Sequence, residues 1–487
     1  MDYIISFDIG TTEIKGIMVN KYGEILLEGS TPLKMIYGQN GEKKQNPESW
    51  WEGIIEIVAC WKRKEIINLY DVKAITLSGQ MENVIPISYN NKCERAILYS
   101  DTRAKEEAEY INHSYKDIGE VIGNYVRSST PFAKLLWLKN KDRDAYHSAK
   151  SFVFSAKDYI IYKLTSSFVT DPITGATTGM MNLNKRIWEE DIIVPMGIDI
   201  EKLPEILQPE EKAGRLSANA AEITGLQEGI PVLCGSGDAG ASTIGAGAVA
   251  EGQGYLHLGT TGWVAIPAKK FVSHSSAFTL AHLPKHLLIA VIPLLIAVIP
   301  LLNGGNIYEW GVQTFTDSED YEGFERMVKE SLSKKNDVLF LPYLYGERDR
   351  KEGGAFISIT AKTTKEDFTR AIVEGLCYSI KQICDELLSP KEGDITIIGG
   401  TSRSTVLCQC LADVLGRQIN VPKNSHVLTS YGALAPAFIA LGWSQSYNHF
   451  VRDYINKKKH VHFKPDMSKR EYHIEQYKRY IKYAKRK

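Results

Sequence analysis

The sequence has no surplus of charge of either sign, because 58 lysines and arginines are matched by 58 aspartates and glutamates over 487 residues. A chain without a net field has no general attraction for nucleic acid or for an anionic membrane surface. Cysteine is also scarce, and seven scattered residues, an odd number, do not form a disulfide framework. We therefore expect a cytoplasmic protein with reduced thiols, whose partner is a small molecule and not nucleic acid.

No segment is long and apolar enough for a membrane span. The one candidate, LLIAVIPLLIAVIPLL at 287–302, falls short of the roughly 20 residues that a spanning helix needs. Pro293 and Pro300 also interrupt it. The N-terminus runs from Met1 into YIISFDIG and lacks the basic and apolar regions of a signal peptide. We therefore expect no membrane partner.

The same run contains the heptad LLIAVIP twice, at 287–293 and at 294–300. A solenoid would need several longer repeats, so we interpret the second heptad as a seven-residue duplication inside a core strand. An odd insertion reverses the in and out alternation of a strand. One copy should therefore hold the strand register, and the other should bulge or loop out.

Periodicity predicts an α/β order in the first part of the chain. Three apolar runs joined by tight turns with glycine predict three antiparallel strands, at 3–7, 14–19 and 25–27. Asn46 and Pro47 are typical of a helix N-terminus. VKAITLSG predicts a buried strand ending at Gly79, and AILYSDTRAKEEAEYI predicts a strand and then a helix capped near Ser100 or Asp101.

A similar order returns later in the chain. GYLHLGTTGWVAIP predicts a strand, a Gly-Thr turn and a second strand, and ITIIGG predicts a buried strand that enters a glycine turn. SRSTVLCQCLADVLG predicts a helix that stops at Gly416. Between the halves lies the glycine-rich stretch 229–254, which we interpret as a ligand site and a hinge. We therefore predict two related α/β halves, 1–243 and 244–487.

Two Gly-Thr turns supply the chemistry expected of a phosphate site. DIGTTEIKG at 8–16 places Asp8 at a strand end and a Gly-Thr-Thr turn after it, and LGTTG at 258–262 repeats the turn in the second half. Backbone N–H groups and threonine hydroxyls can donate to phosphate oxygens, and a carboxylate can hold Mg²⁺ through water. One such turn is a weak signal, whereas two from related halves indicate a nucleotide clamped between them.

Two further glycine-rich stretches accompany these turns. IIGGTSRS at 397–404 lacks the lysine of a P-loop and the full GxGxxG spacing, but its glycines would let a flat base lie against the backbone. GSGDAGAS places Asp238 among residues with almost no side chain. Such an aspartate is often a turn residue. A need for a base beside an incoming hydroxyl would give it a catalytic role.

In their order along the chain, these motifs resemble those of the FGGY carbohydrate kinases, most closely the xylulokinase-like members. Other matching segments are TPFAKLLWL, SAKDYIIYKLT, FLPYLYGER and SYGALAPAFIALG. The resemblance implies an α/β fold of two actin-like (ribonuclease H-like) domains flanking a cleft for nucleotide and sugar. It also implies transfer of the γ-phosphoryl group of ATP, with Mg²⁺, to a hydroxyl of a small-molecule sugar.

The resemblance also implies the roles of individual residues. Asp238 matches the catalytic base, and Asp8 matches the carboxylate associated with Mg²⁺. The nucleotide side comprises Asp8, Gly10, Thr11, Thr12, Lys15, Gly259, Thr260, Thr261, Gly399, Gly400 and Thr401. The sugar side comprises Gln80, Met81, Glu82, Tyr99, Asp101 and Asp238. Closure around Gly245 and Gly247 would exclude water.

The sugar side departs from the xylulokinase pattern at three places. SGQMEN puts Glu82 where xylulokinases carry histidine, Ala239 replaces the asparagine after the catalytic aspartate, and LYSD replaces LWND at Tyr99 and Ser100. Glu82 would repel an anionic acceptor such as gluconate, so a neutral acceptor is favoured. The resemblance favours a ketopentose such as D-xylulose, and ribulose, glycerol and erythritol are the alternatives.

Other interpretations stay open. An actin-like fold can also serve a non-metabolic ATPase, such as a filament subunit or a chaperone, although SGQME and TPFAKLLWL argue for a sugar pocket. The stretch 456–487 is strongly basic. We interpret it as a solvated helix whose tyrosines and isoleucines pack on the rest of the protein, with nucleic-acid binding as the minor alternative.

The chain could also assemble as a homodimer, and this oligomeric state is one to test.

Overall fold

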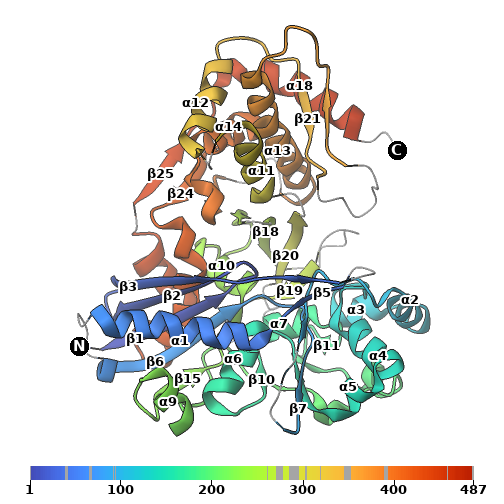
Figure 1. Cartoon of the computed structure of the whole chain (residues 1–487), viewed down its shortest axis with the longest axis vertical. Helices are drawn as coiled ribbons and strands as arrows, with labels where there is room; N and C mark the ends of the chain where they lie inside the picture. Colours follow the sequence, from blue (N-terminus) through green and yellow to red (C-terminus); the bar gives the residue numbers. More distant parts are fainter. Residues whose placement is uncertain are drawn as a thin grey trace.

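The computed structural model describes residues 2–38, 42–64, 69–90, 93, 95–259, 262–269, 278–283, 295–301, 304–317, 320–344, 353–388, 393–457 and 459–484. Two seven-stranded sheets form the centres of two lobes, the first at the bottom of Figure 1 and the second at the top. No helix in these ranges is long and apolar enough to cross a bilayer.

The first sheet combines antiparallel and parallel strands. Its antiparallel part consists of β1 (Tyr3–Ile9), β2 (Glu13–Asn20) and β3 (Ile25–Pro32). The other strands are β6 (Val72–Gly79), β14 (Lys212–Arg215), β15 (Pro231–Leu233) and β16 (Ser236–Gly237). β6 runs parallel to β1, and both β15 and β16 run parallel to β6. The four strands predicted at 3–7, 14–19, 25–27 and 72–79 are therefore confirmed.

The second sheet repeats this arrangement. Its order is β19 (Phe278–Ala281), β20 (Leu295–Leu301), β18 (Gly262–Ala268), β17 (Tyr255–Leu258), β23 (Ile395–Ile398), β24 (Ile419–Pro422) and β25 (His460–Phe463). Pairing is antiparallel from β19 to β17, then parallel from β17 through β23 to β24. In both sheets a run of antiparallel strands, three in the first and four in the second, continues into parallel strands and ends in a further antiparallel pair, which confirms the prediction of two related α/β halves.

Helices cover both faces of the first sheet. α1 (Pro47–Lys64) and α6 (Ala156–Thr165) pack on one face, and α10 (Asp238–Gly245), α15 (Leu428–Gly432) and α16 (Leu434–Ala440) pack on the other. The last three helices share a buried cluster with side chains from both sheets. α15 lies between β24 and β25 of the second sheet in sequence, yet the Ser6 hydroxyl on β1 donates to the Ser430 carbonyl at 2.7 Å. The division at 243/244 stays a prediction.

Two helix starts show how local signals compete with tertiary contacts. α1 begins as predicted, because Asn46 Oδ1 accepts the Glu48 N–H at 3.1 Å. After β8 (Ala96–Ile97), however, α2 (Lys105–Ser114) begins at Lys105 and not near Ser100 or Asp101. The Asp101 carboxylate accepts hydrogen bonds from the Arg103 guanidinium and is not available as a cap. The predicted start of α2 is therefore wrong.

The helices of the second lobe are arranged around α13 (Lys365–Leu387). Four helices contact it: α11 (Gly305–Phe315), α12 (Tyr321–Ser331), α14 (Thr405–Leu415) and α18 (Arg470–Ala484). α14 ends as predicted at Gly416, which has a left-handed φ of 65°. On α18, Tyr480 is fully buried, whereas Ile474 is 45% exposed. The predicted packing of the basic helix is confirmed for Tyr480 and wrong for Ile474.

The second copy of the duplicated heptad forms β20. Residues 295–301 pair with β18 on one side, and residues 295–298 pair with β19 on the other. The chain then enters α11, which contains Trp310, as predicted. The first copy, at 287–293, lies outside the described residues. The second copy therefore occupies the strand that a single copy would be expected to form.

Deletion of Leu287–Pro293 is expected to leave the midpoint of thermal unfolding unchanged or to raise it. The two heptads are identical, so deletion of either gives the same protein, and β20 keeps its sequence and both neighbours. Scanning calorimetry of the two proteins measures the effect. A matched control replaces the same seven residues by alternating glycine and serine, which keeps the chain length. A fall of more than about 5 °C on deletion would contradict the duplication hypothesis.

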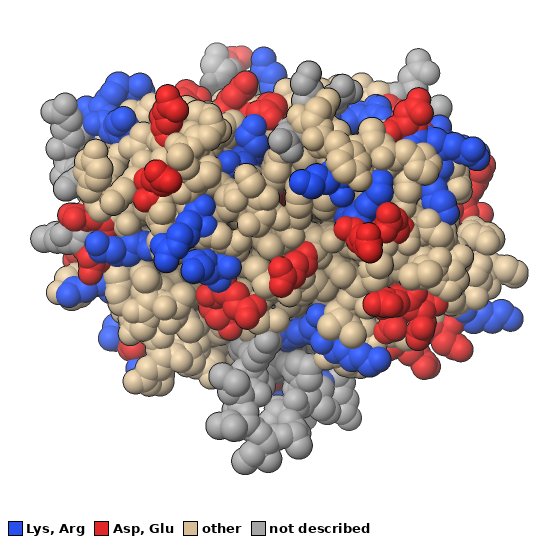
Figure 2. All heavy atoms as spheres, turned by 90° about the horizontal axis from the view of Figure 1, so that it is seen from below, with Lys and Arg blue, Asp and Glu red and all other residues tan. Residues whose placement is uncertain are grey.

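Surface charge is mixed where the first lobe faces outward. Figure 2 shows acidic and basic side chains interspersed over this face, without a broad basic area. Acidic and basic side chains are therefore not segregated on this face.

Candidate active site

The two Gly-Thr turns follow corresponding strands, β1 and β17. In the first turn, the Gly10 N–H donates to the Glu13 carbonyl at 3.1 Å, and Thr12 is exposed. In the second, the Gly259 carbonyl accepts the Gly305 N–H at 3.0 Å. The predicted site residues Thr260 and Thr261 lie outside the described residues. The exposed Thr12 is therefore placed where a ligand can reach it.

Asp8 lies at the end of β1, in register with Ser78 of β6, and Ser78 is in register with Ser236 of β16. Burial raises the pKa of Asp8, and the charge of Lys15 opposes this increase from the neighbouring strand. Asp8 Oδ1 is buried and has no hydrogen-bond partner among the described residues. A carboxylate oxygen without a protein donor suits the water shell of Mg²⁺. The position thus fits the predicted metal-associated carboxylate.

Asp238 is the first residue of α10 and is partly exposed. Burial raises its pKa to about 8, and the negative charges of Asp8 and Asp171 add to the increase. The N–H of the preceding residue, Gly237, donates to Asp171 Oδ2 at 3.2 Å, and Lys157 Nζ lies 3.0 Å from the same oxygen. A carboxylate with a pKa near neutrality is suited to accept a proton from a hydroxyl.

Gln80 connects the first phosphate turn to the predicted sugar side. Its side-chain amide donates to Gln45 Oε1 at 2.8 Å and to the Gly10 carbonyl at 3.3 Å. The Thr11 hydroxyl lies 3.4 Å from Gln80 Oε1 and 3.4 Å from the Tyr99 hydroxyl. The predicted nucleotide and sugar residues therefore share one hydrogen-bond network.

The loop after β6 lies against the start of α10. A Cβ atom on Gly237 would overlap with the Met81 sulfur, so Met81 packs directly against the residue before Asp238. Glu82 has a left-handed φ of 60°. Its carboxylate accepts the Ser129 hydroxyl at 2.9 Å, and its carbonyl accepts Lys134 Nζ at 3.0 Å. The structure thus packs Met81, one of the predicted sugar residues, against the residue that precedes Asp238.

Asp101 has a different environment from the one predicted for a sugar ligand. It is fully buried, and its carboxylate accepts two hydrogen bonds from the Arg103 side chain, at 2.9 and 2.6 Å, and one from the Lys43 N–H at 2.9 Å. Burial alone would raise the pKa of Asp101, but these hydrogen bonds outweigh it and lower the pKa. We therefore interpret Asp101 as a support for the loop that carries Tyr99.

The predicted adenosine-side loop meets the second Gly-Thr turn. Gly399 has a φ of 100°, and a Cβ atom there would overlap with the Leu258 carbonyl at the end of β17. A Cβ atom on Gly305 would overlap with both Thr401 Oγ1 and the Gly259 carbonyl. By contrast, apart from its chain neighbours, no heavy atom of the described residues lies within 4 Å of a Cβ position on Gly400. The three segments are therefore packed together, with space over Gly400 that the described part of the chain does not fill.

Two other predicted residues mediate contacts to the C-terminal half of the chain. Lys15 Nζ pairs with Glu13 at 2.9 Å and donates to the His426 carbonyl at 3.0 Å. At the predicted hinge, a Cβ atom on Gly245 would overlap with the Leu428 carbonyl, so glycine allows α10 and α15 to approach closely. Hinge motion at Gly245 and Gly247 stays a prediction.

Several buried polar residues that support the site were not among the residues predicted from the sequence. Gln45, Lys134, Lys157 and Asp171 are each at most 1% exposed. A signal was present for Lys157, because a Lys-Asp pair precedes an apolar helical run in SAKDYIIYKLT. A charge buried in such a helix requires a partner, but the sequence does not show that the partner is Asp171.

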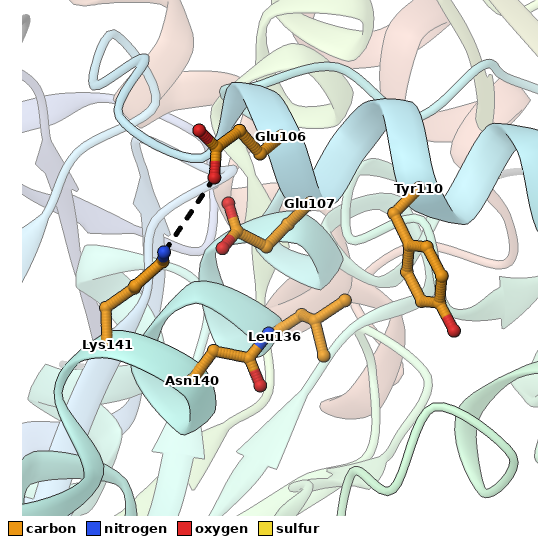
Figure 3. Close-up of a pocket in the computed structure, with 6 residues that line it drawn as sticks. All are labelled: Glu106, Glu107, Tyr110, Leu136, Asn140 and Lys141. Atoms are coloured by element: carbon orange, nitrogen blue, oxygen red, sulfur yellow. Dashed lines mark ion pairs between the residues drawn. The ribbon is translucent and has the colours of Figure 1, made fainter.

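One cavity of the molecule lies elsewhere. A space of about 250 Å³ lies between α2 and α4 (Pro131–Lys141), where Glu106 and Lys141 form an ion pair at 3.8 Å (Figure 3). Tyr110, Leu136, Asn140 and Glu107 complete its lining. None of these residues is a candidate site residue.

Comparisons with known proteins match most of the chain. Residues 3–245 match the N-terminal domain of the FGGY family of carbohydrate kinases, and residues 295–441 match its C-terminal domain. Xylulose kinase of Staphylococcus xylosus is 28% identical over 468 residues, which are 93% of this chain and 94% of that protein. These matches and the paired sheets confirm the predicted fold of two actin-like domains.

Solved structures agree over nearly the full length. The ligand-bound xylulose kinase of Lactobacillus acidophilus has a TM-score of 0.86 and 24% identity, and covers 99% of this chain and 97% of its own. Gluconate kinase of the same organism also has a TM-score of 0.86, with 25% identity and the same coverage. One of these kinases is named for a neutral sugar, xylulose, and the other for an anionic one, gluconate, so this architecture occurs in kinases of both kinds.

Proposed function

Because the chain belongs to the FGGY family of carbohydrate kinases, we propose that it phosphorylates a neutral ketopentose, with D-xylulose as the first candidate. The chain is a sugar kinase, a class that uses ATP as the phosphoryl donor. The identity of the acceptor and the use of Mg²⁺ are our proposals.

The position of Asp238 is the observation that carries this proposal. The residue follows Gly237, which packs against Met81 of the predicted sugar loop. It also lies close enough to Asp8 for the two carboxylates to repel each other. Asp238 is thus flanked by the proposed metal carboxylate and the proposed sugar loop, where a base for phosphoryl transfer is required.

We assign the steps as follows. Asp238 accepts the proton of the sugar hydroxyl as that oxygen bonds to the γ-phosphorus, and the bond from the γ-phosphorus to the bridging oxygen of ATP breaks, which releases ADP. The N–H groups of Thr11 and Thr12 donate to phosphate oxygens, and Thr11 links this turn to Gln80 and Tyr99 on the sugar side. Mg²⁺, held through water by Asp8, would supply positive charge for the phosphate oxygens. Most of the catalysis then comes from alignment and electrostatics.

The acceptor is inferred from the polar groups around the sugar loop. The Glu82 carboxylate adds negative charge beside the proposed acceptor site, which favours a neutral sugar over gluconate. Gln80 and Tyr99 offer further hydrogen bonds to hydroxyl groups. Ribulose, glycerol and erythritol remain the alternatives, because hydroxyl pattern is selected by these polar partners.

A coupled assay of ADP release over ketopentoses, polyols and aldonates tests the proposal. We expect D-xylulose or another neutral ketopentose to raise ADP release at least about tenfold above the rate without sugar. The Asp238→Asn variant, assayed in parallel, should lose the sugar-dependent part. Failure of every sugar to stimulate ADP release would overturn the kinase reaction, and a preference for gluconate would overturn the charge argument.

A further inference from the structure

Lys134 is a buried lysine that the proposed reaction does not use. It lies on α4, its side chain is fully buried, and Nζ donates to the Leu98 carbonyl at 2.7 Å and to the Glu82 carbonyl at 3.0 Å. An ammonium group is costly to bury unless it is hydrogen-bonded and faces negative charge. Two carbonyls supply the hydrogen bonds at this position.

The charged groups around Lys134 affect the pKa of its ammonium group in opposite directions. Burial lowers the pKa of Lys134 to about 8, the charges of Glu82 and Asp101 oppose the decrease, and the charge of Arg103 adds to it. Because Asp101 is paired with Arg103, Glu82 is the remaining carboxylate whose charge favours the ammonium form of Lys134. The lysine and the predicted sugar residue are thus electrostatically linked.

The two carbonyls belong to the two loops that carry the proposed sugar residues. Glu82 lies in the loop after β6, and Leu98 directly precedes Tyr99. A second contact joins the same loops, because the Tyr99 N–H donates to Asn83 Oδ1 at 3.0 Å. Lys134 therefore bridges these loops from the side of α4.

Glu82 needs such support because of its backbone. A non-glycine residue with φ of 60° is held in a sparsely populated conformation. Lys134 binds the carbonyl of Glu82, and Ser129, just before the same helix, binds its carboxylate. The segment 129–134 thus fixes both the backbone and the side chain of the residue at which this chain departs from the xylulokinase pattern.

We propose that Lys134 is a positioning residue for the sugar, which holds the Glu82 and Tyr99 loops at the spacing that the acceptor requires. This inference rests on the sugar site of the proposed function. Among the described residues, the hydrogen bonds of Lys134 go to the two sugar loops, and the Tyr99 loop meets the phosphate turn only through a 3.4 Å contact with Thr11, so removal of Lys134 should affect the sugar much more than ATP. A merely structural lysine would not separate the two substrates.

Replacement of Lys134 by methionine tests the proposal. We expect the KM for the accepted sugar to rise about tenfold or more. The KM for ATP and the rate of ATP hydrolysis without sugar should stay within about twofold. Lys139→Met is the matched control, because Lys139 lies on the same helix and donates to the Met196 carbonyl at 3.1 Å, away from both loops. It should leave both KM values unchanged.

Two further measurements keep the proposal testable. If Lys134→Met does not fold, Ser129→Ala removes only the hydroxyl that holds Glu82, and an increase in the sugar KM of about threefold is expected. Amide hydrogen exchange of 80–83 and 98–101 should accelerate in Lys134→Met but not in Lys139→Met, whether or not a sugar is found. The proposal is overturned if the sugar KM of a folded Lys134→Met protein is unchanged. If only Ser129→Ala can be tested, an unchanged sugar KM in that variant overturns it. A wild-type protein that no sugar stimulates contradicts the proposed function instead.

Discussion

Replacing Asp238 by asparagine is expected to lower kcat by about 10²- to 10⁴-fold, the range for loss of a general base. Asparagine has the same shape but cannot accept the hydroxyl proton. The KM values for sugar and ATP should change by less than about threefold, because the packing of Met81 against Gly237 and the turn at 10–12 are not altered. Steady-state kinetics with the best acceptor from the sugar screen measure both quantities.

The stability of this variant separates lost chemistry from lost structure. Burial and the charges of Asp8 and Asp171 raise the pKa of Asp238 to about 8 in the folded protein, whereas an unfolded aspartate titrates near 3.9. A carboxylate with a raised pKa destabilises the folded state as pH rises through this interval. Asp238→Asn should therefore melt at the same or a higher temperature than the wild type, and its advantage should grow from pH 5 to pH 9.

Asp320→Asn is the matched control for Asp238→Asn. Asp320 also lies at a helix N-terminus, where it accepts the Gly323 N–H at 2.8 Å at the start of α12. Asparagine caps a helix as well as aspartate does, so kcat should change by less than about twofold. If Asp238→Asn retains more than about a tenth of the wild-type kcat, the base for the reaction is another group.

The parts of the site that sequence could predict depend on short-range signals. Asp8 and the turn at 10–12 follow a compact apolar strand, and the same pattern at 255–259 marks the second turn. Strand, glycine and threonine are adjacent in the chain in both places, so local rules suffice. Asp238 could be predicted from local sequence as well, because it is a single carboxylate among residues with almost no side chain.

The parts that sequence could not predict depend on contacts between distant segments. Asp101 was expected to face the sugar, but Arg103 and the Lys43 N–H occupy its carboxylate. The bridging contacts of Lys134 could not be predicted from the sequence, because its two carbonyl partners lie 36 and 52 positions away. α15 and α16 contain small apolar residues that would suit either sheet, and only the tertiary structure places them on the first. Local patterns thus predict the elements, and tertiary contacts decide which polar groups remain available to a ligand.

Lys157→Met is expected to destabilise the folded protein by about 3–5 kcal/mol, the usual effect of removing one partner from a buried ion pair. Lys157 contacts Asp158 at 2.5 Å and Asp171 at 3.0 Å, and all three side chains are fully buried. Burial alone would lower the pKa of Lys157, but the charges of Asp158 and Asp171 outweigh it and raise the pKa. Methionine fills a similar volume and leaves two carboxylates without their cation. The melting temperature should fall by roughly 3–10 °C.

The pH dependence identifies the cause of this loss. An unpaired buried carboxylate has a raised pKa, so its cost is present at high pH and disappears when the group is protonated. The deficit of Lys157→Met should therefore shrink between pH 8 and pH 5. Lys163→Met is the control, because Lys163 lies on the same helix and its partly exposed ion pair with Glu48 should contribute at most about 1 kcal/mol. Equal losses in the two variants, or a deficit for Lys157→Met that does not depend on pH, would show that the buried charge does not need its partner. In that case the Asp171 contact to the Gly237 N–H would be held by its hydrogen bonds alone.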